Sequence, residues 1–178
     1  MSVPIRAMSA RRAALACAAA LLAACGGAPP PPSLPAPFAA IPGAVVPSSV
    51  IYDDDAGGMR DSVRLVVRDR AAFEVLWRSA TRGQASPPPL PAIDFTREMV
   101  VAVGAGRMTP SDHIRVDSVG GVRQGGGREA LMVLVRTTEG CERFLAAAWP
   151  LQLVRVRRHD GPVLFVERRA RAEGCPRA

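Results

Sequence analysis

Apolar and polar residues alternate along several short stretches of the chain with the period of a half-buried β-strand. Val63, Leu65 and Val67 alternate with arginine, and Ile114 and Val116 alternate with Arg115 and Asp117. Because successive side chains of a strand point to opposite faces, each stretch predicts a strand with one face buried. A short apolar stretch at 50–52 predicts a first strand ahead of them.

Two other stretches are apolar without interruption, at residues 99–103 and 130–135, and a third at 151–156 is mostly apolar but contains Gln152 and Arg155. Runs of this length are typical of strands that are covered on both faces. In the last run the alternation slips around Leu153-Val154, which predicts a β-bulge there. Asp160-Gly161 is a strong hairpin signal and leads into a final strand at 163–166.

One segment has the period of a helix. Phe73, Leu76, Trp77 and Ala80 follow the spacing i, i+3, i+4, i+7 and define one apolar face. Asp69 is a suitable N-cap, and Gly83 suits the stop. A Pro-rich loop follows at 84–92. We interpret the aromatic pair on this helix as core.

Glycine and acidic clusters mark the expected connections. Gly120-Gly121 and Gly125–Gly127 predict a loose linker, and residues 53–58 predict a turn. The three adjacent acids of that turn do not have the alternating ligand spacing of a calcium loop, so we expect no metal site. Together the elements predict an α+β domain, with one amphipathic helix packed on a curved, mostly antiparallel sheet of about six strands.

The N-terminus has the organisation of an export signal. Arg6, Arg11 and Arg12 precede an apolar run at 13–24 that is too short to span a bilayer. The run ends in Leu-Ala-Ala followed by Cys25, which resembles the bacterial lipobox. The resemblance implies cleavage before Cys25, diacylglycerol on its thiol, and a lipid-anchored lipoprotein. Gly26 after the cysteine favours the outer membrane, on its periplasmic side or at the cell surface. An ordinary signal peptide cleaved nearby is the alternative, and Cys17 is a weaker rival site.

These features divide the chain into four segments. Residues 1–24 form the signal peptide, and 25–48 form a lipidated cysteine with a Pro- and Ala-rich tether that favours extended polyproline II. Residues 49–170 form the α+β domain, and 171–178 form a C-terminal tail. All 23 basic residues are arginine, and without the three of the leader the remaining 20 face 16 acids. A charge of +4 argues against dedicated nucleic-acid binding.

Two cysteines remain once Cys25 is assigned to lipid. In an oxidising compartment, Cys141 and Cys175 are expected to form a disulfide, with two unpaired thiols as the alternative. A catalytic cysteine is not expected, because Cys141 lacks a recognisable histidine partner pattern.

No constellation of residues predicts catalysis. Ser111, Asp112 and His113 suggest a hydrolytic triad, but residues on one short segment seldom adopt triad geometry, and no nucleophile elbow is present. We interpret His113 and His159 as turn or edge residues, and we expect no metal and no cofactor.

Arginines are concentrated near the C-terminus, and a basic patch is expected if the last two strands pair. Such a patch would meet anionic lipid or an acidic partner, and the alternative is charge that protects an edge hairpin from aggregation. Its candidate members are Arg155, Arg157, Arg158 and Arg168.

The span from Val63 to Arg169 resembles the C-terminal domain of the PrcB family of protease complex subunits. The resemblance is carried by residues 65–69 with the helix ending in Leu76-Trp77, by residues 93–103, by Gly140-Cys141, and by residues 153–168. Family members usually have a Thr-Gly-Gly-Tyr turn after the central strand, whereas this chain has Pro110-Ser111-Asp112-His113.

The resemblance implies an exported, non-enzymatic protein that supports a protease. We therefore expect an accessory protein that binds or stabilises an exported protease or another envelope partner. Its candidate partner-binding loop contains Arg107, Thr109, Asp112 and His113. A protease inhibitor that uses exposed loops such as 104–113 is the alternative, and a hydrolase is a more distant one.

Overall fold

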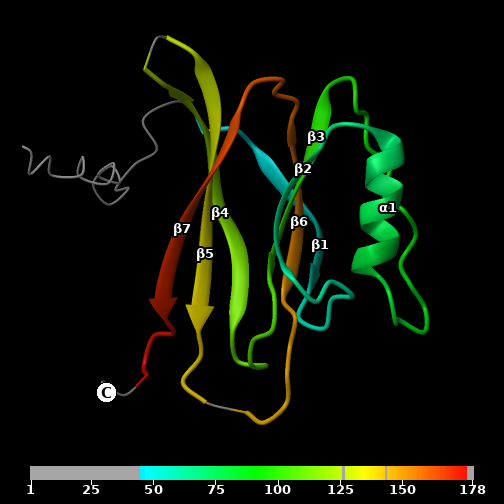
Figure 1. Ribbon diagram of the computed structural model, residues 1–178, viewed down its shortest axis with the longest axis vertical. Coiled ribbons are helices and arrows are strands. Elements are labelled where there is room, and N and C mark those ends of the chain that lie inside the picture. Colours follow the sequence, from blue (N-terminus) through cyan, green and yellow to red (C-terminus); the bar gives the residue numbers. More distant parts are fainter. Residues whose placement is uncertain (1–44, 126, 143, 176–178) are drawn as a thin grey trace, which may run out of the picture. The chain divides into compact units, whose positions relative to one another are not determined.

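The computed structural model describes residues 45–125, 127–142 and 144–175. Cys25, the leader and the tether up to residue 44 lie outside this range. In the described part, seven strands and one helix form two sheets and a helical layer (Figure 1). The elements are β1 (Ser48–Asp54), β2 (Ser62–Val67), α1 (Arg70–Ala80), β3 (Glu98–Ala105), β4 (His113–Arg123), β5 (Glu129–Glu139), β6 (Leu151–Arg157) and β7 (Val163–Arg171).

The helix forms where the sequence predicts it. The Asp69 carboxylate caps it by accepting a hydrogen bond of 2.8 Å from the backbone N–H of Ala72. The four residues of the apolar face are all buried, against the residues of β1, β2, β3 and β6 that face α1. The rings of Tyr52 and Phe73 both pack near Trp77, with centroids 5.3 and 5.9 Å from the centroid of its ring.

The single curved sheet expected from the sequence is wrong, because the strands divide into two sheets. One has the order β1-β6-β3-β2 and is antiparallel, and the other has the order β4-β5-β7. The apolar run in β3 explains the arrangement. Val100 and Ala102 face the helix, whereas Met99, Val101 and Val103 face the second sheet. One helix covers only one face of such a strand, so the other face needs a second layer.

The hairpin expected at Asp160-Gly161 is also absent. The chain does turn there, but β6 and β7 belong to different sheets, and β7 pairs in parallel with β5. The turn is held to the first sheet by Arg68, which donates hydrogen bonds of 3.0 Å to the carbonyls of His159 and Gly161. The chain therefore crosses from one sheet to the other at the point where the sequence indicates a local reversal.

Two smaller expectations need correction. Gly120 and Gly121 are not a linker, because both lie within β4 and pair with β5. A register irregularity does occur opposite Leu153-Val154, but the extra residue is Ile51 of β1 rather than a residue of β6. β6 is a central strand, and the burial of residues 151–154 and Val156 reflects cover on both faces.

Candidate functional site: a pinned loop cluster

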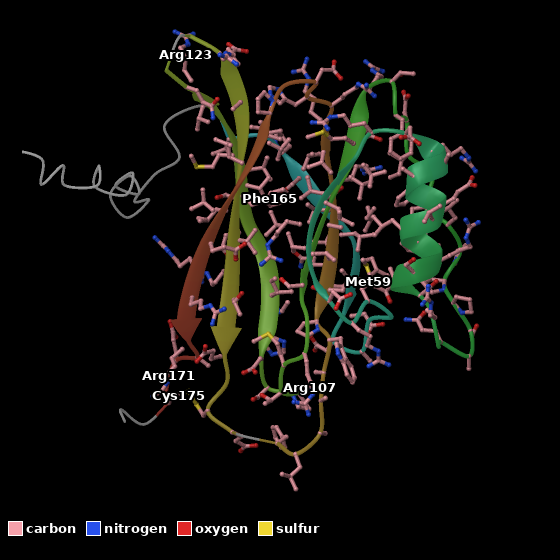
Figure 2. The ribbon with its side chains drawn as sticks, in the orientation of Figure 1. Met59, Arg107, Arg123, Phe165, Arg171 and Cys175 are labelled. Atoms are coloured by element: carbon pink, nitrogen blue, oxygen red, sulfur yellow. A yellow bond between two sulfur atoms is a disulfide. The ribbon has the colours of Figure 1, made fainter. Side chains whose placement is uncertain are left out.

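Three segments meet at one end of the two sheets, and we call them the loop cluster. They are the turn 106–112 between β3 and β4, the loop 140–149 between β5 and β6, and the segment 172–175 after β7. Figure 2 shows Arg107 and Cys175 at this end and Arg123 at the opposite end. The expected partner-binding loop lies here, so the structure places it beside a second loop that sequence reasoning did not select.

Asp112 connects the first two segments. Its side chain is buried, and one carboxylate oxygen accepts a hydrogen bond of 2.9 Å from the backbone N–H of Gly140. The other oxygen accepts hydrogen bonds from the backbone N–H and the hydroxyl of Thr109, at 3.0 and 2.9 Å. Asp112 and Thr109 therefore hold the turn in shape through these hydrogen bonds.

The approach of the two loops requires glycine at position 140. A Cβ added there would collide with the side chain and carbonyl oxygen of Ser111. The Ser111 hydroxyl also donates a hydrogen bond of 2.8 Å to the carbonyl of Glu142. Gly140 therefore makes the close contact between the two loops possible, and the disulfide cysteine Cys141 is the next residue in the chain.

Cys141 and Cys175 form a disulfide in the structure. The bond attaches the segment after β7 to the start of the loop 140–149. A backbone hydrogen bond of 2.8 Å from Ala172 to Glu139 supports the same junction. The first end of the loop is thus held covalently and by hydrogen bonds.

The second end of the loop is held by hydrogen bonds to two other segments. Met108 and Ala148 exchange two backbone hydrogen bonds of 2.9 Å, and the N–H of Trp149 donates to the carbonyl of Asp55 at 2.8 Å. The guanidinium of Arg60 lies 3.6 Å from the centroid of the Trp149 ring, within the range of a cation–π contact.

Two large apolar side chains are exposed between these anchors. Leu145 is fully exposed, with a relative accessible area of 104%, and Phe144 is 45% exposed. Phe144 also lines a hollow of about 280 Å³ together with Arg107, Met108, Thr109 and three other residues. The sequence signal that could have identified this feature is an adjacent Phe-Leu pair in the connection between two strands.

The remaining candidate residues are separated. Nδ1 of His113 lies 3.3 Å from a carboxylate oxygen of Asp55, and both side chains are about half exposed. Within the described contacts, no hydrogen bond joins His113 to Ser111. His159 lies in the turn after β6, and its Nε2 is buried and has no hydrogen-bond partner among the described residues.

The residues of the expected basic patch do not form a stripe, because Arg168 lies in the second sheet and the other three lie on or directly after β6. Arg155 contacts Ser49 and Glu98, at 3.2 and 3.5 Å. Arg158 bonds to Asp160 at 2.8 Å and to the carbonyls of Arg68 and Phe95. These contacts give Arg155 and Arg158 structural roles.

The acids of the sequence Asp53-Asp54-Asp55 are also used separately. Asp53 accepts a hydrogen bond of 2.9 Å from Gln152, whereas Asp54 accepts from the Tyr52 hydroxyl at 2.8 Å and from Gln84 at 2.7 Å. Burial, together with the nearby Asp54 carboxylate, raises the pKa of Tyr52 above its ordinary value.

Within the three described ranges, no group of three or more His, Cys, Asp or Glu side chains is placed to hold a metal ion. No helix of the same part of the chain is long and apolar enough to cross a membrane. Comparison of the chain with protein-family models, curated proteins and solved structures gives no match, so the candidate site is defined by its geometry alone.

Proposed function

We propose that this chain is an exported, lipid-anchored accessory protein, without catalytic activity, whose domain binds an exported protease through the loop cluster. The lipobox-like sequence before Cys25 supports the anchor, and the resemblance to the PrcB family supports the class of partner. Lipid at Cys25 would keep the domain at the envelope, and the Pro-rich tether would let it work away from the membrane surface.

The observation that carries the proposal is the exposure of Leu145 and Phe144 on a loop fixed at both ends. Burying a large apolar side chain contributes about 1.5–3 kcal/mol. A loop that is already ordered loses less conformational entropy on binding than a flexible one. The loop cluster therefore has two properties of a protein-binding element, an apolar anchor and preorganisation.

The polar residues near this loop support a role without catalysis. The Ser111 hydroxyl donates to a backbone carbonyl, and the imidazole of His113 contacts Asp55 rather than Ser111. A serine nucleophile needs a base within hydrogen-bond reach. The carboxylate of Asp112 is occupied by Thr109 and Gly140.

A protease inhibitor is the second candidate function, and the exposure of Leu145 favours a different loop from the one expected. Residues 104 and 105 belong to β3, and the turn 106–112 is closed by Asp112. The segment between Glu142 and Ala147 instead carries the exposed apolar side chains. If the domain inhibits a protease, this segment is the one that would enter the active site.

The test is site-specific photo-crosslinking in intact cells, followed by mass spectrometry. A photoreactive amino acid at position 145 should capture one exported protease. The same amino acid at position 75 is the matched control, because Val75 is also an exposed apolar residue (56%) and lies on α1, away from the loop cluster. Recovery of the protease from both positions, or from neither, would overturn the proposal.

A second measurement distinguishes the two functions. The purified protease is assayed with stoichiometric amounts of the wild-type chain, of Leu145→Asp and of Val75→Asp. An accessory subunit should maintain or raise protease activity over time, whereas an inhibitor should lower it. For either function, the Leu145→Asp variant should no longer change protease activity, whereas the Val75→Asp variant should change it as the wild type does. Equal effects of both variants would exclude the loop 140–149 as the contact.

A further inference from the structure

The end of the domain opposite the loop cluster contains a cleft with a different chemistry. Its volume is about 630 Å³, and it lies between the β4–β5 hairpin and the end of β6. Figure 2 shows Arg123 at this end of the molecule. The lining residues that matter here are Gly121, Arg123, Glu129, Arg157, Arg158 and His159.

Two of the three arginines in the lining are available for a ligand. Arg123 and Arg157 are exposed, and neither makes an ion pair or side-chain hydrogen bond within the described part of the chain. Glu98, which lies opposite Arg157 across the β3–β6 pair, contacts Arg155 instead, at 3.5 Å. Arg158 is held by Asp160 and by two backbone carbonyls, so it adds fixed positive charge.

The remaining lining favours an anion with some apolar surface. Glu129 is the one carboxylate among the lining residues, so three guanidinium groups outnumber it. Val46, Val122, Ala130 and Leu131 supply apolar walls. Gly121 has no side chain, and a Cβ added there would meet no atom within 4 Å, which leaves the space above the strand open.

We propose that this cleft binds a phosphate group, carried either by an anionic lipid or by a soluble phosphate ester. Guanidinium groups bind phosphate through charge-assisted, often bidentate hydrogen bonds. Two guanidinium groups that have no ion pair or side-chain hydrogen bond within the described residues, beside a third that is fixed, match the charge of a phosphate better than that of a single carboxylate. The cleft is separate from the loop cluster, so the inference does not depend on the proposed partner.

The test uses the full chain carrying Cys25→Ser, so that lipid at that position cannot contribute. Two-dimensional NMR follows titration with inorganic phosphate, with glycerol 3-phosphate and with acetate. Phosphatidylcholine vesicles with and without an anionic phospholipid test the lipid source by flotation. Phosphate should shift the backbone signals of Gly121, Ala130 and Leu131, and acetate should bind more weakly.

Variants make the test specific to the cleft. Replacing Arg123 and Arg157 by glutamine should weaken phosphate binding roughly tenfold or more. Gly121→Leu should weaken it by filling the open space, with no change of charge. The matched control replaces Arg78 and Arg82 by glutamine, since both are exposed, have no ion pair in the described structure and lie at the end of α1.

Each outcome decides the proposal. Binding of the soluble phosphates that depends on the cleft arginines supports a phosphate ester as the source. If binding depends on the cleft arginines only for vesicles that contain the anionic phospholipid, the source of the phosphate is a lipid headgroup. The proposal is overturned if no probe binds at the cleft, if the cleft and control variants bind alike, or if acetate binds as tightly as phosphate.

Discussion

Asp112→Asn should destabilise the domain by opening the contact between the turn 106–112 and the loop 140–149. Asn has the size of Asp, but one of its two terminal atoms is an NH₂ donor. In the native structure one carboxylate oxygen of Asp112 receives the N–H of Gly140, and the other receives the N–H of Thr109. Whichever way the amide is turned, its NH₂ group faces one of these two backbone donors.

The magnitude follows from the loss of that hydrogen bond. A buried donor left without an acceptor costs about 1–3 kcal/mol. The side chain of Asp112 is only 2% exposed, so water does not readily replace the lost acceptor. For a domain of this size, such a loss should lower the melting temperature by roughly 4–10 °C.

Thermal and urea unfolding followed by circular dichroism measure the loss, and hydrogen exchange of residues 140–147 locates it. Asp61→Asn is the matched control, because Asp61 is exposed and its side chain makes no hydrogen bond or ion pair within the described ranges. We expect the control to change the free energy of unfolding by less than about 0.5 kcal/mol. If Asp112→Asn melts at the wild-type temperature, the carboxylate does not hold the two loops together and the reasoning is refuted.

Three further predictions follow from the same structure. Tyr52 is the single tyrosine of a chain without lysine. Because its pKa is raised in the folded domain, the unfolded chain loses the phenolic proton at a lower pH than the folded chain does. The contribution of Tyr52 to the free energy of unfolding is therefore present below pH 10.0 and is lost as the pH rises above that value. Tyrosinate absorbance should therefore appear with unfolding, and a midpoint near 10 in the folded domain would contradict this. Replacing Cys141 and Cys175 by serine should lower the unfolding free energy by about 3–4 kcal/mol in the chain-entropy model, for a sequence separation of 34; urea unfolding of this variant and of the oxidised wild type measures it, and coincident curves would exclude a stabilising bond. Cys25→Ser should move the protein from the membrane fraction to the soluble fraction without changing its melting temperature, and retention in the membrane fraction would exclude lipid at Cys25 as the anchor.

The division into two sheets depends on packing that the local sequence pattern does not show. The run at 99–103 correctly indicates a strand covered on both faces, but the described part of the chain contains only one amphipathic helix to cover it. The second cover is a sheet whose strands lie far apart in the sequence, since β7 pairs with β5 across the whole of β6. Local patterns show that a strand is buried, whereas the identity of its neighbour depends on long-range packing.

In the candidate site, too, local sequence patterns and long-range packing give different information. The sequence places Asp112 in an exposed-looking turn, and only the structure shows that its carboxylate is buried and bonded to Gly140 of the neighbouring loop. Phe144 and Leu145 were not selected, because apolar residues between two strands are usually read as part of the core. The two side chains are exposed because the disulfide at Cys141 and the backbone hydrogen bonds at Ala148 fix the path of the loop, and the sequence does not show these contacts.

The sequence by itself determined the local features of this protein. The helix and its cap, the stretches that form strands and the cysteines available for pairing depend on residues near one another in the chain, and their periodicity and capping chemistry are local. Only the tertiary structure decided that β6 and β7 separate into different sheets, that Arg123 and Arg157 line one cleft, and that Leu145 is exposed beside a disulfide. These features depend on contacts between residues distant in the sequence, whose geometry is set by the packing of the two sheets and the helix.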